Sequence, residues 1–286
     1  MKNVTGFFAF WLLAVSLLFS ACYSPRYVHS PVAVNVPVLA KKGDSKIAGY
    51  YSFNPGEKPN QTTAGKLSSG NGLDIQAAYA LTNHLAVQAA FNVRNEKNYA
   101  DFNINRADSS LISYKRNSIE FGLGYFTYFD KRRASFFQVF AGAGFGSSSF
   151  SDKYFTGNMP ARNFKMDVTR LYIQPAILIK YGEVFASSLS SRVSLVYFKN
   201  VQSDYTAEEL FRYQLQDIQK GAKVFWEPAF TNTFGLKKLP GLKLELQMGL
   251  AFLMSDRFVD YRTLNISAGL LLDIPAFFDK KDPEKN

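Results

Sequence analysis

The chain has 286 residues, a net charge of +10, 27 Phe and 16 Tyr, and a single cysteine, which excludes an intrachain disulfide. A helical membrane protein would contain several apolar runs of about 20 residues, and this sequence contains one, at its amino terminus. The excess of basic residues is compatible with nucleic-acid binding. The secretion signal described next makes binding to nucleic acid an unexpected role.

Residues 1–21 have the features of a secretion signal. Lys2 precedes an apolar run that closes on small residues immediately before Cys22. A cationic start, an apolar core and small residues at the break are typical of a signal peptide. The pattern resembles a bacterial lipoprotein signal, which implies that Cys22 becomes the lipidated amino terminus and carries acyl chains such as palmitate. Cleavage without lipidation, and retention of the run as a helical anchor, are the alternatives.

Residues 22–44 follow the signal and contain Pro25, Pro31 and Pro37. Prolines at this spacing favour an extended chain without regular structure. We therefore predict a periplasmic tether that links the lipid at Cys22 to the first strand.

The hairpin around residues 130–133 shows the pattern that the later segments repeat. On both sides of this charged link, large apolar residues alternate with glycine and small polar residues. Such period-two alternation predicts two paired strands. A symmetric turn would place Phe121 opposite Ala143 on the apolar face and Gly122 opposite Gly142 on the other face.

Ten segments of this kind fall within residues 45–278. Their predicted extents are Lys46–Asn54, Gly72–Leu81, Leu85–Arg94, Tyr114–Phe129, Ala134–Ser147, Met166–Tyr181, Ser187–Lys199, Lys223–Gly235, Gly241–Leu253 and Tyr261–Asp273. Short and long links alternate between them, as in bacterial outer-membrane barrels with short periplasmic turns and long outer loops. We predict an all-β, antiparallel up-and-down transmembrane β-barrel of about ten strands, with both chain ends in the periplasm and a polar tail at 279–286.

The small, polar face of these strands is expected to line the lumen. Its predicted charge network consists of Asp74, Glu120, Arg170, Lys180, Arg192, Glu227, Lys243 and Glu245. Four acids and four bases in a narrow barrel should pair, because unpaired buried charge is costly. A mostly sealed lumen follows, with a small-solute channel or a ligand-binding barrel as the alternative. A soluble β-sandwich would also alternate, but it would turn a charged face, not a glycine-rich one, toward water.

The two histidines limit the possible chemistry. His29 lies in the predicted tether and His84 in a predicted periplasmic turn, so neither is expected to reach a site at the outer rim. This argues against a histidine base and against a His-based metal site. We predict a non-enzymatic protein without a cofactor, and a barrel hydrolase acting on lipid or peptide remains a third hypothesis.

The link between the seventh and eighth segments is predicted to contain a short helix. Thr206 and Glu209 have the spacing of a capping box, and Leu215 and Ile218 continue a helical spacing that Gly221 would end. Such a helix would pack on the rim of its own barrel or, alternatively, bind a molecule outside.

The signal ending at Cys22, the ten alternating segments and glycine-rich stretches such as residues 140–146 resemble the small Gram-negative outer-membrane β-barrel proteins. That grouping includes the opacity proteins and the barrel of outer-membrane protein A. The resemblance implies a location in the cell outer membrane, with membrane lipids as partners and long loops available to an external ligand or surface partner. Many such barrels end on an aromatic residue, whereas here Phe277 and Phe278 are followed by the polar tail.

Overall fold

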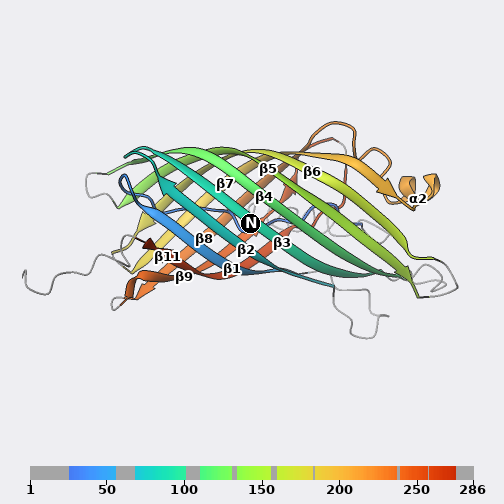
Figure 1. The fold of residues 1–286 in the computed structure, drawn as a ribbon, viewed down its shortest axis with the longest axis horizontal. Helices are drawn as coiled ribbons and strands as arrows, with labels where there is room; N and C mark the ends of the chain where they lie inside the picture. Colours follow the sequence, from blue (N-terminus) through green and yellow to red (C-terminus); the bar gives the residue numbers. More distant parts are fainter. Residues whose placement is uncertain are drawn as a thin grey trace, which may run out of the picture.

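A computed structural model describes residues 26–55, 68–100, 110–130, 134–155, 160–182, 184–236, 239–256 and 258–274. Within them, ten long strands form one closed antiparallel sheet, to which a two-residue strand is added at one rim (Figure 1). The strands are β1 (Ser45–Pro55), β2 (Ser69–Ala80), β3 (Leu85–Ala100), β4 (Ser110–Tyr128), β5 (Ser135–Tyr154), β6 (Arg162–Lys180), β7 (Phe185–Ser203), β8 (Lys223–Leu236), β9 (Leu239–Leu250), β10 (Phe252–Leu253) and β11 (Leu264–Asp273).

The sheet closes on itself because β9 pairs with both β8 and β11, and β11 pairs with β1. All other long strands pair with their neighbours in sequence. The predicted antiparallel up-and-down barrel is therefore confirmed, and the β-sandwich alternative is wrong. Among the described residues, no helix is both long and apolar enough to cross a membrane.

The register of β4 and β5 is the one that the alternation predicts. Phe121 lies opposite Ala143, and Gly122 lies opposite Gly142. Since successive side chains of a strand point to opposite faces, Phe121 and Ala143 lie on the outer face, and Gly122 and Gly142 lie on the inner face. Residues 131–133 of the predicted turn lie outside the described residues.

The strands are longest on the side of the barrel formed by β4 to β7. These four have 19 or 20 residues, whereas β1, β2, β9 and β11 have 10 to 12. About 9–11 residues suffice to cross a membrane. The long strands therefore extend beyond the membrane at the end of the barrel that carries the long links. Several predicted strands were too short: β3, for example, runs on from Arg94 to Ala100, whereas the predicted strand Tyr261–Asp273 began ahead of β11, which starts at Leu264. Backbone pairing continues beyond Arg94 because it does not require an apolar outer face.

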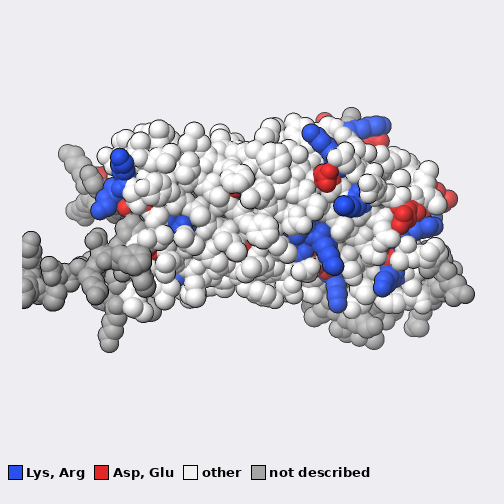
Figure 2. Space-filling view, viewed as in Figure 1, with Lys and Arg blue, Asp and Glu red and all other residues white. Residues whose placement is uncertain are grey.

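The outer surface carries an apolar belt. Phe121, Leu123 and Leu270 are each more than half exposed, whereas inward residues such as Gln76 and Asn265 are fully buried. Figure 2 shows that the visible middle of the barrel is almost free of charged groups, which gather mainly at the end that carries the long links. An exposed apolar surface of this size is unfavourable in water and is the normal outer face of a barrel in lipid.

The segment ahead of β1 runs inside the barrel, which corrects the predicted tether at 22–44. Residues 26–37 are all buried, and Leu39 is 2% exposed; this blue segment passes along the interior in Figure 1. About eight strands already enclose a space that side chains can fill, so ten strands leave room for an extended chain. The predicted signal at 1–21, Cys22 and the tail at 279–286 lie outside the described residues.

The glycines of the inner face make room for a large side chain. Tyr172 of β6 lies over Gly122 and Gly142, and its hydroxyl accepts a hydrogen bond of 3.0 Å from Gln88 Nε2. A Cβ added at Gly142 would lie 2.1 Å from the carbonyl oxygen of Phe121 and 2.6 Å from the Tyr172 hydroxyl.

We expect Gly142→Val to destabilise the barrel by about 1–3 kcal/mol or more, because overpacking here displaces backbone as well as side chains. Gly49→Val is the matched control, because a Cβ at Gly49 has nothing within 4 Å. Unfolding by urea in lipid vesicles would measure both variants. Equal effects of the two substitutions would contradict the close packing at Gly142.

Candidate functional site

At the end of the barrel with the long links, the buried amino-terminal segment is anchored by Arg26. Its Nη2 lies 2.5 Å from Asp152 Oδ2, and its guanidinium carbon is 3.8 Å from the ring centroid of Tyr213. The backbone N–H of Arg26 donates to Asp260 Oδ2 at 3.1 Å, and the Tyr205 hydroxyl donates to Asp152 at 3.0 Å. Burial raises the pKa of the Tyr205 hydroxyl above its usual range, although Arg26 opposes this shift, so the hydroxyl remains a donor.

In the middle of the barrel, three glutamines bind the main chain of the segment. Gln76, Gln247 and Gln174, from β2, β9 and β6, donate through Nε2 to the successive carbonyls of residues 33–35 at 2.9, 2.8 and 2.7 Å. Gln247 Oε1 also accepts from the N–H of Val34 at 2.6 Å. An extended chain inside the barrel has no strand partner for these groups, and buried peptide groups must be paired. The glutamines therefore take the place of a neighbouring strand.

At the other end of the barrel, the segment meets the short turn between β2 and β3. The N–H of Lys42 donates to Asn83 Oδ1 at 3.0 Å, and the Tyr128 hydroxyl donates to the carbonyl of Ala40. The segment thus passes through the whole lumen before β1 begins.

Four of the eight predicted lumen charges form one buried cluster. Glu120 Oε1 lies 2.8 Å from Arg170 Nη1, and Glu120 Oε2 lies 3.1 Å from Arg192 Nη1. Arg170 Nη2 is also 4.0 Å from Glu227 Oε1. Arg192 further donates to Gln174 Oε1 through Nε and Nη2 at 3.0 and 2.8 Å, so the same glutamine connects the charge cluster to the buried segment.

Two further predicted acids have partners that the prediction did not include. Asp74 accepts two hydrogen bonds from Arg94, at 2.8 and 2.7 Å. Glu245 accepts from Lys46 at 3.1 Å and from the Tyr50 hydroxyl at 2.6 Å. All five side chains are buried.

The two predicted lysines lie apart from the central cluster, near the end with the short turns. Lys243 Nζ is 3.2 Å from Asp273 Oδ2. Lys180 Nζ lies 4.7 Å from the centroid of the Phe136 ring, a cation–π contact. Both are only partly buried.

Some lumen residues that the sequence analysis did not include follow from the alternation of inward and outward residues along their strands. Lys46 has the same parity as Tyr50, and Arg94 the same parity as Asn92, so both point inward. Arg26 gave no comparable signal, because it belongs to no strand. The alternating valines from Val32 to Val38 nevertheless indicated that this segment is buried, since a solvated tether does not need apolar side chains.

His29 is buried in the lumen, not in a tether. Its Nε2 lies 3.1 Å from Glu227 Oε1, and the Ser194 hydroxyl donates to Glu227 Oε2 at 2.6 Å. A nucleophilic serine would instead donate to the histidine. Ser194, His29 and Glu227 therefore do not have the hydrogen bonds of a catalytic triad. His84 lies at the short turn, with Nδ1 3.2 Å from the carbonyl oxygen of Phe126.

The link after β7 folds over one mouth of the barrel. Its helix α2 spans Ala207–Arg212, and the predicted capping box of Thr206 and Glu209 is confirmed. The helix ends sooner than the spacing suggested, because Gln214 has a φ of 56°, a left-handed conformation that interrupts a helix.

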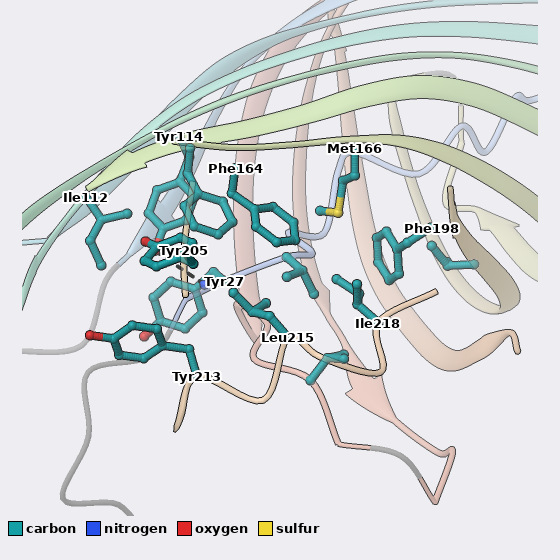
Figure 3. Packing of buried hydrophobic residues seen from close by; sticks show 14 of the residues in the cluster. Tyr27, Ile112, Tyr114, Phe164, Met166, Phe198, Tyr205, Tyr213, Leu215 and Ile218 are labelled. Atoms are coloured by element: carbon teal, nitrogen blue, oxygen red, sulfur yellow. Dashed lines mark hydrogen bonds between the residues drawn. The ribbon is translucent and has the colours of Figure 1, made fainter. Parts of the chain in front are cut away.

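Beyond the helix, the link reaches into the barrel. Leu215 and Ile218 are buried together with Tyr205 and Tyr213, as Figure 3 shows. They pack near Tyr27 of the buried amino-terminal segment. Inward residues of the long strands complete this cluster: Ile112, Tyr114, Phe150, Phe164, Met166, Val196, Phe198 and Phe225. The mouth at the long links is therefore covered by apolar packing.

A cavity lies beside residues 28–32 of the buried amino-terminal segment. It is partly open, so its empty space of about 550 Å³ includes some of the solvent outside, and it is lined by His29, Asn92, Arg116 and Arg170, among others. Within the described ranges, no three His, Cys, Asp or Glu residues are grouped so that they could hold a metal ion.

A closed antiparallel cylinder, an apolar outer belt and a polar interior together define a membrane-spanning β-barrel. This class follows from the physical chemistry of the two faces: lipid contacts the outside, and the backbone groups are paired within the sheet. Residues 26–40 of the chain lie inside this barrel.

No protein-family model and no curated protein matches the chain. Among solved structures, it is similar to the translocator domain of autotransporter NalP from Neisseria meningitidis, with 10% identity, 80% of this chain and 87% of that chain covered, and a TM-score of 0.48. It is also similar to an outer membrane channel from Pseudomonas putida F1 (10% identity, 84% and 99% covered, TM-score 0.37) and to the outer membrane protein OprG from Pseudomonas aeruginosa (10%, 82% and 95%, TM-score 0.35). Similarity at this level carries no conclusion about function.

Proposed function

We propose that this chain is a non-enzymatic outer-membrane lipoprotein with a closed barrel. The barrel anchors the protein in the outer membrane of a Gram-negative cell, with membrane lipids around its belt. Its long links face outward, where they are available to an external ligand or a surface partner. The observation that carries this proposal is the occupation of the lumen by residues 26–40.

The charges of the lumen support a closed barrel over a channel. A conducting pore needs a continuous path of water, and one dominant sign of charge along it favours one kind of ion. Here Glu120 is paired with two arginines, and Glu245 is paired with Lys46. The apolar cluster that contains Tyr205 and Leu215 covers one mouth. Together with the glutamines that bind residues 33–35, these contacts fill much of the lumen, and a partly open cavity lies beside residues 28–32.

The lengths of the links support an orientation with the short turns in the periplasm. Four residues connect β2 to β3 and four connect β6 to β7, whereas 13 separate β1 from β2. Outer-membrane barrels have short periplasmic turns and longer outer loops. The apolar run that ends before Cys22 supports a lipid on that residue, and such a lipid would add a second anchor to the barrel.

We expect the purified full-length protein to give no steady current in planar lipid bilayers. The buried segment and the paired charges leave ions no continuous hydrated path. Conductance measured under increasing voltage is the test, with detergent buffer alone as the blank. Steady open-channel currents from the full chain would contradict the closed barrel and support the alternative of a small-solute channel.

A further inference from the structure

The direction in which the amino-terminal segment runs through the barrel decides where the chain ahead of it emerges. Arg26 pairs with Asp152 of β5, and in the sheet Asp152 lies opposite Ile112 and Arg162. Those two residues are close to the start of β4 and at the start of β6, where the long links meet the barrel. Arg26 therefore lies at the mouth with the long links.

The other end of the segment lies at the opposite mouth. Lys42 contacts Asn83 in the turn between β2 and β3, and Gly43 donates its N–H to the carbonyl of Ala80 at 2.9 Å. The chain then turns back, with Gly43 at a φ of 90°, and enters β1. Followed from Arg26, the chain enters by the mouth with the long links, passes through the lumen and leaves at the short turns.

The entry point is bound by main-chain contacts as well as by charge. The N–H of Val28 donates to the carbonyl of Asp260 at 2.8 Å, and the N–H of Arg262 donates to the carbonyl of His29 at 2.9 Å. Arg26 and Asp152 are both fully buried, so moving one away would leave the other charge buried and unpaired, which is strongly unfavourable. The segment is therefore fixed at this mouth in the folded barrel.

We propose that the amino-terminal segment is threaded outward through the barrel, so that the chain ahead of Arg26 is presented on the outer side of the membrane. This inference rests on the proposed orientation, with the short turns in the periplasm. Cys22 is four residues ahead of Arg26, and four extended residues reach about 14 Å. A lipid or another group on Cys22 is then presented on the same side as the long links, opposite to the periplasmic position that the sequence alone suggested.

Antibody labelling of cells that produce the full-length protein tests this proposal. A short hydrophilic epitope is inserted in three separate variants: directly after Cys22, in the long link 56–67, and at Asn83 in a short turn. We expect the first two epitopes to be labelled on intact cells, and the third only after the outer membrane is permeabilised.

The three positions separate failure of the inference from failure of the proposed function. An epitope after Cys22 that is hidden on intact cells, while the one in 56–67 is labelled, would overturn the threading and leave the orientation intact. Labelling of intact cells only at Asn83 would overturn the proposed orientation. An absence of labelling at all three positions on intact cells would contradict the outer-membrane location itself and, with it, the outward display.

A cross-link tests the threading without any insertion. In the variant Arg26→Cys, Asp152→Cys, both partners of the buried ion pair are removed together, so no charge is left unpaired. A short bismaleimide should join these two positions in the folded protein. It should not join the pair in the control Arg26→Cys, Asp130→Cys, because Asp130 lies at the opposite end of the barrel. The unaltered chain, whose sole cysteine is Cys22, is the blank, and cross-linking only in the control would overturn the threading.

Discussion

Deletion of residues 26–40, which joins Pro25 to Lys41, is expected to convert a silent barrel into one that conducts ions. The deletion removes the chain that occupies the lumen and leaves the amide groups of Gln76, Gln174 and Gln247 to water. A ten-stranded barrel is wider than the roughly eight strands that side chains alone can fill. Single-channel recording in planar bilayers should therefore show steady current for the deletion variant and none for the full chain.

The matched control for this deletion keeps the segment and trims its side chains. Val34→Ala, Val36→Ala removes apolar contacts with Phe136 and Leu178 but leaves the main-chain groups that the glutamines bind. This control should remain closed, because the lumen recognises the peptide groups of residues 33–35. Circular dichroism should give the same β-sheet spectrum for the deletion variant and for the control, which shows that both are folded. A folded deletion variant as silent as the full chain would show that residues 26–40 do not seal the lumen.

Glu120→Gln is expected to reduce the free energy of unfolding by about 3–5 kcal/mol, the usual cost of removing one partner of a buried ion pair. The carboxylate lies between Arg170 and Arg192 and is 3% exposed. Its loss leaves the buried Arg192 without its carboxylate partner, and leaves Arg170 with only the longer contact of 4.0 Å to Glu227. Urea unfolding in lipid vesicles, followed by the fluorescence of Trp226 on β8, measures the change.

Glu208→Gln supplies the control for Glu120→Gln. It is the same chemical change in the pair formed by Glu208 and Arg212, whose side chains are 81% and 49% exposed, and exposed pairs contribute below about 1 kcal/mol. Adding Arg192→Gln to Glu120→Gln should recover part of the lost stability, because it removes the buried charge whose carboxylate partner was Glu120. Similar losses in Glu120→Gln and Glu208→Gln would contradict the buried cluster.

The strands were predictable because alternation is a local property of the sequence. The pairing of Phe121 with Ala143 follows from a symmetric turn, and each following pair is then set by the regular geometry of the sheet. The same alternation identified Glu120, Arg170 and Arg192 as inward residues. It did not reveal which acid meets which base, because that depends on how β4, β6 and β7 face one another across the lumen.

The sequence by itself determined the barrel, its two faces and the order of its short and long links. Only the tertiary structure decided that residues 26–40 fill the lumen and that Arg26 meets Asp152 at the mouth with the long links. The physical reason is that the free space inside a barrel depends on how many strands close it, a property of the whole cylinder. A short stretch of prolines and valines such as residues 31–38 specifies an extended backbone, but the place where that backbone lies is set by the space that the closed sheet leaves for it.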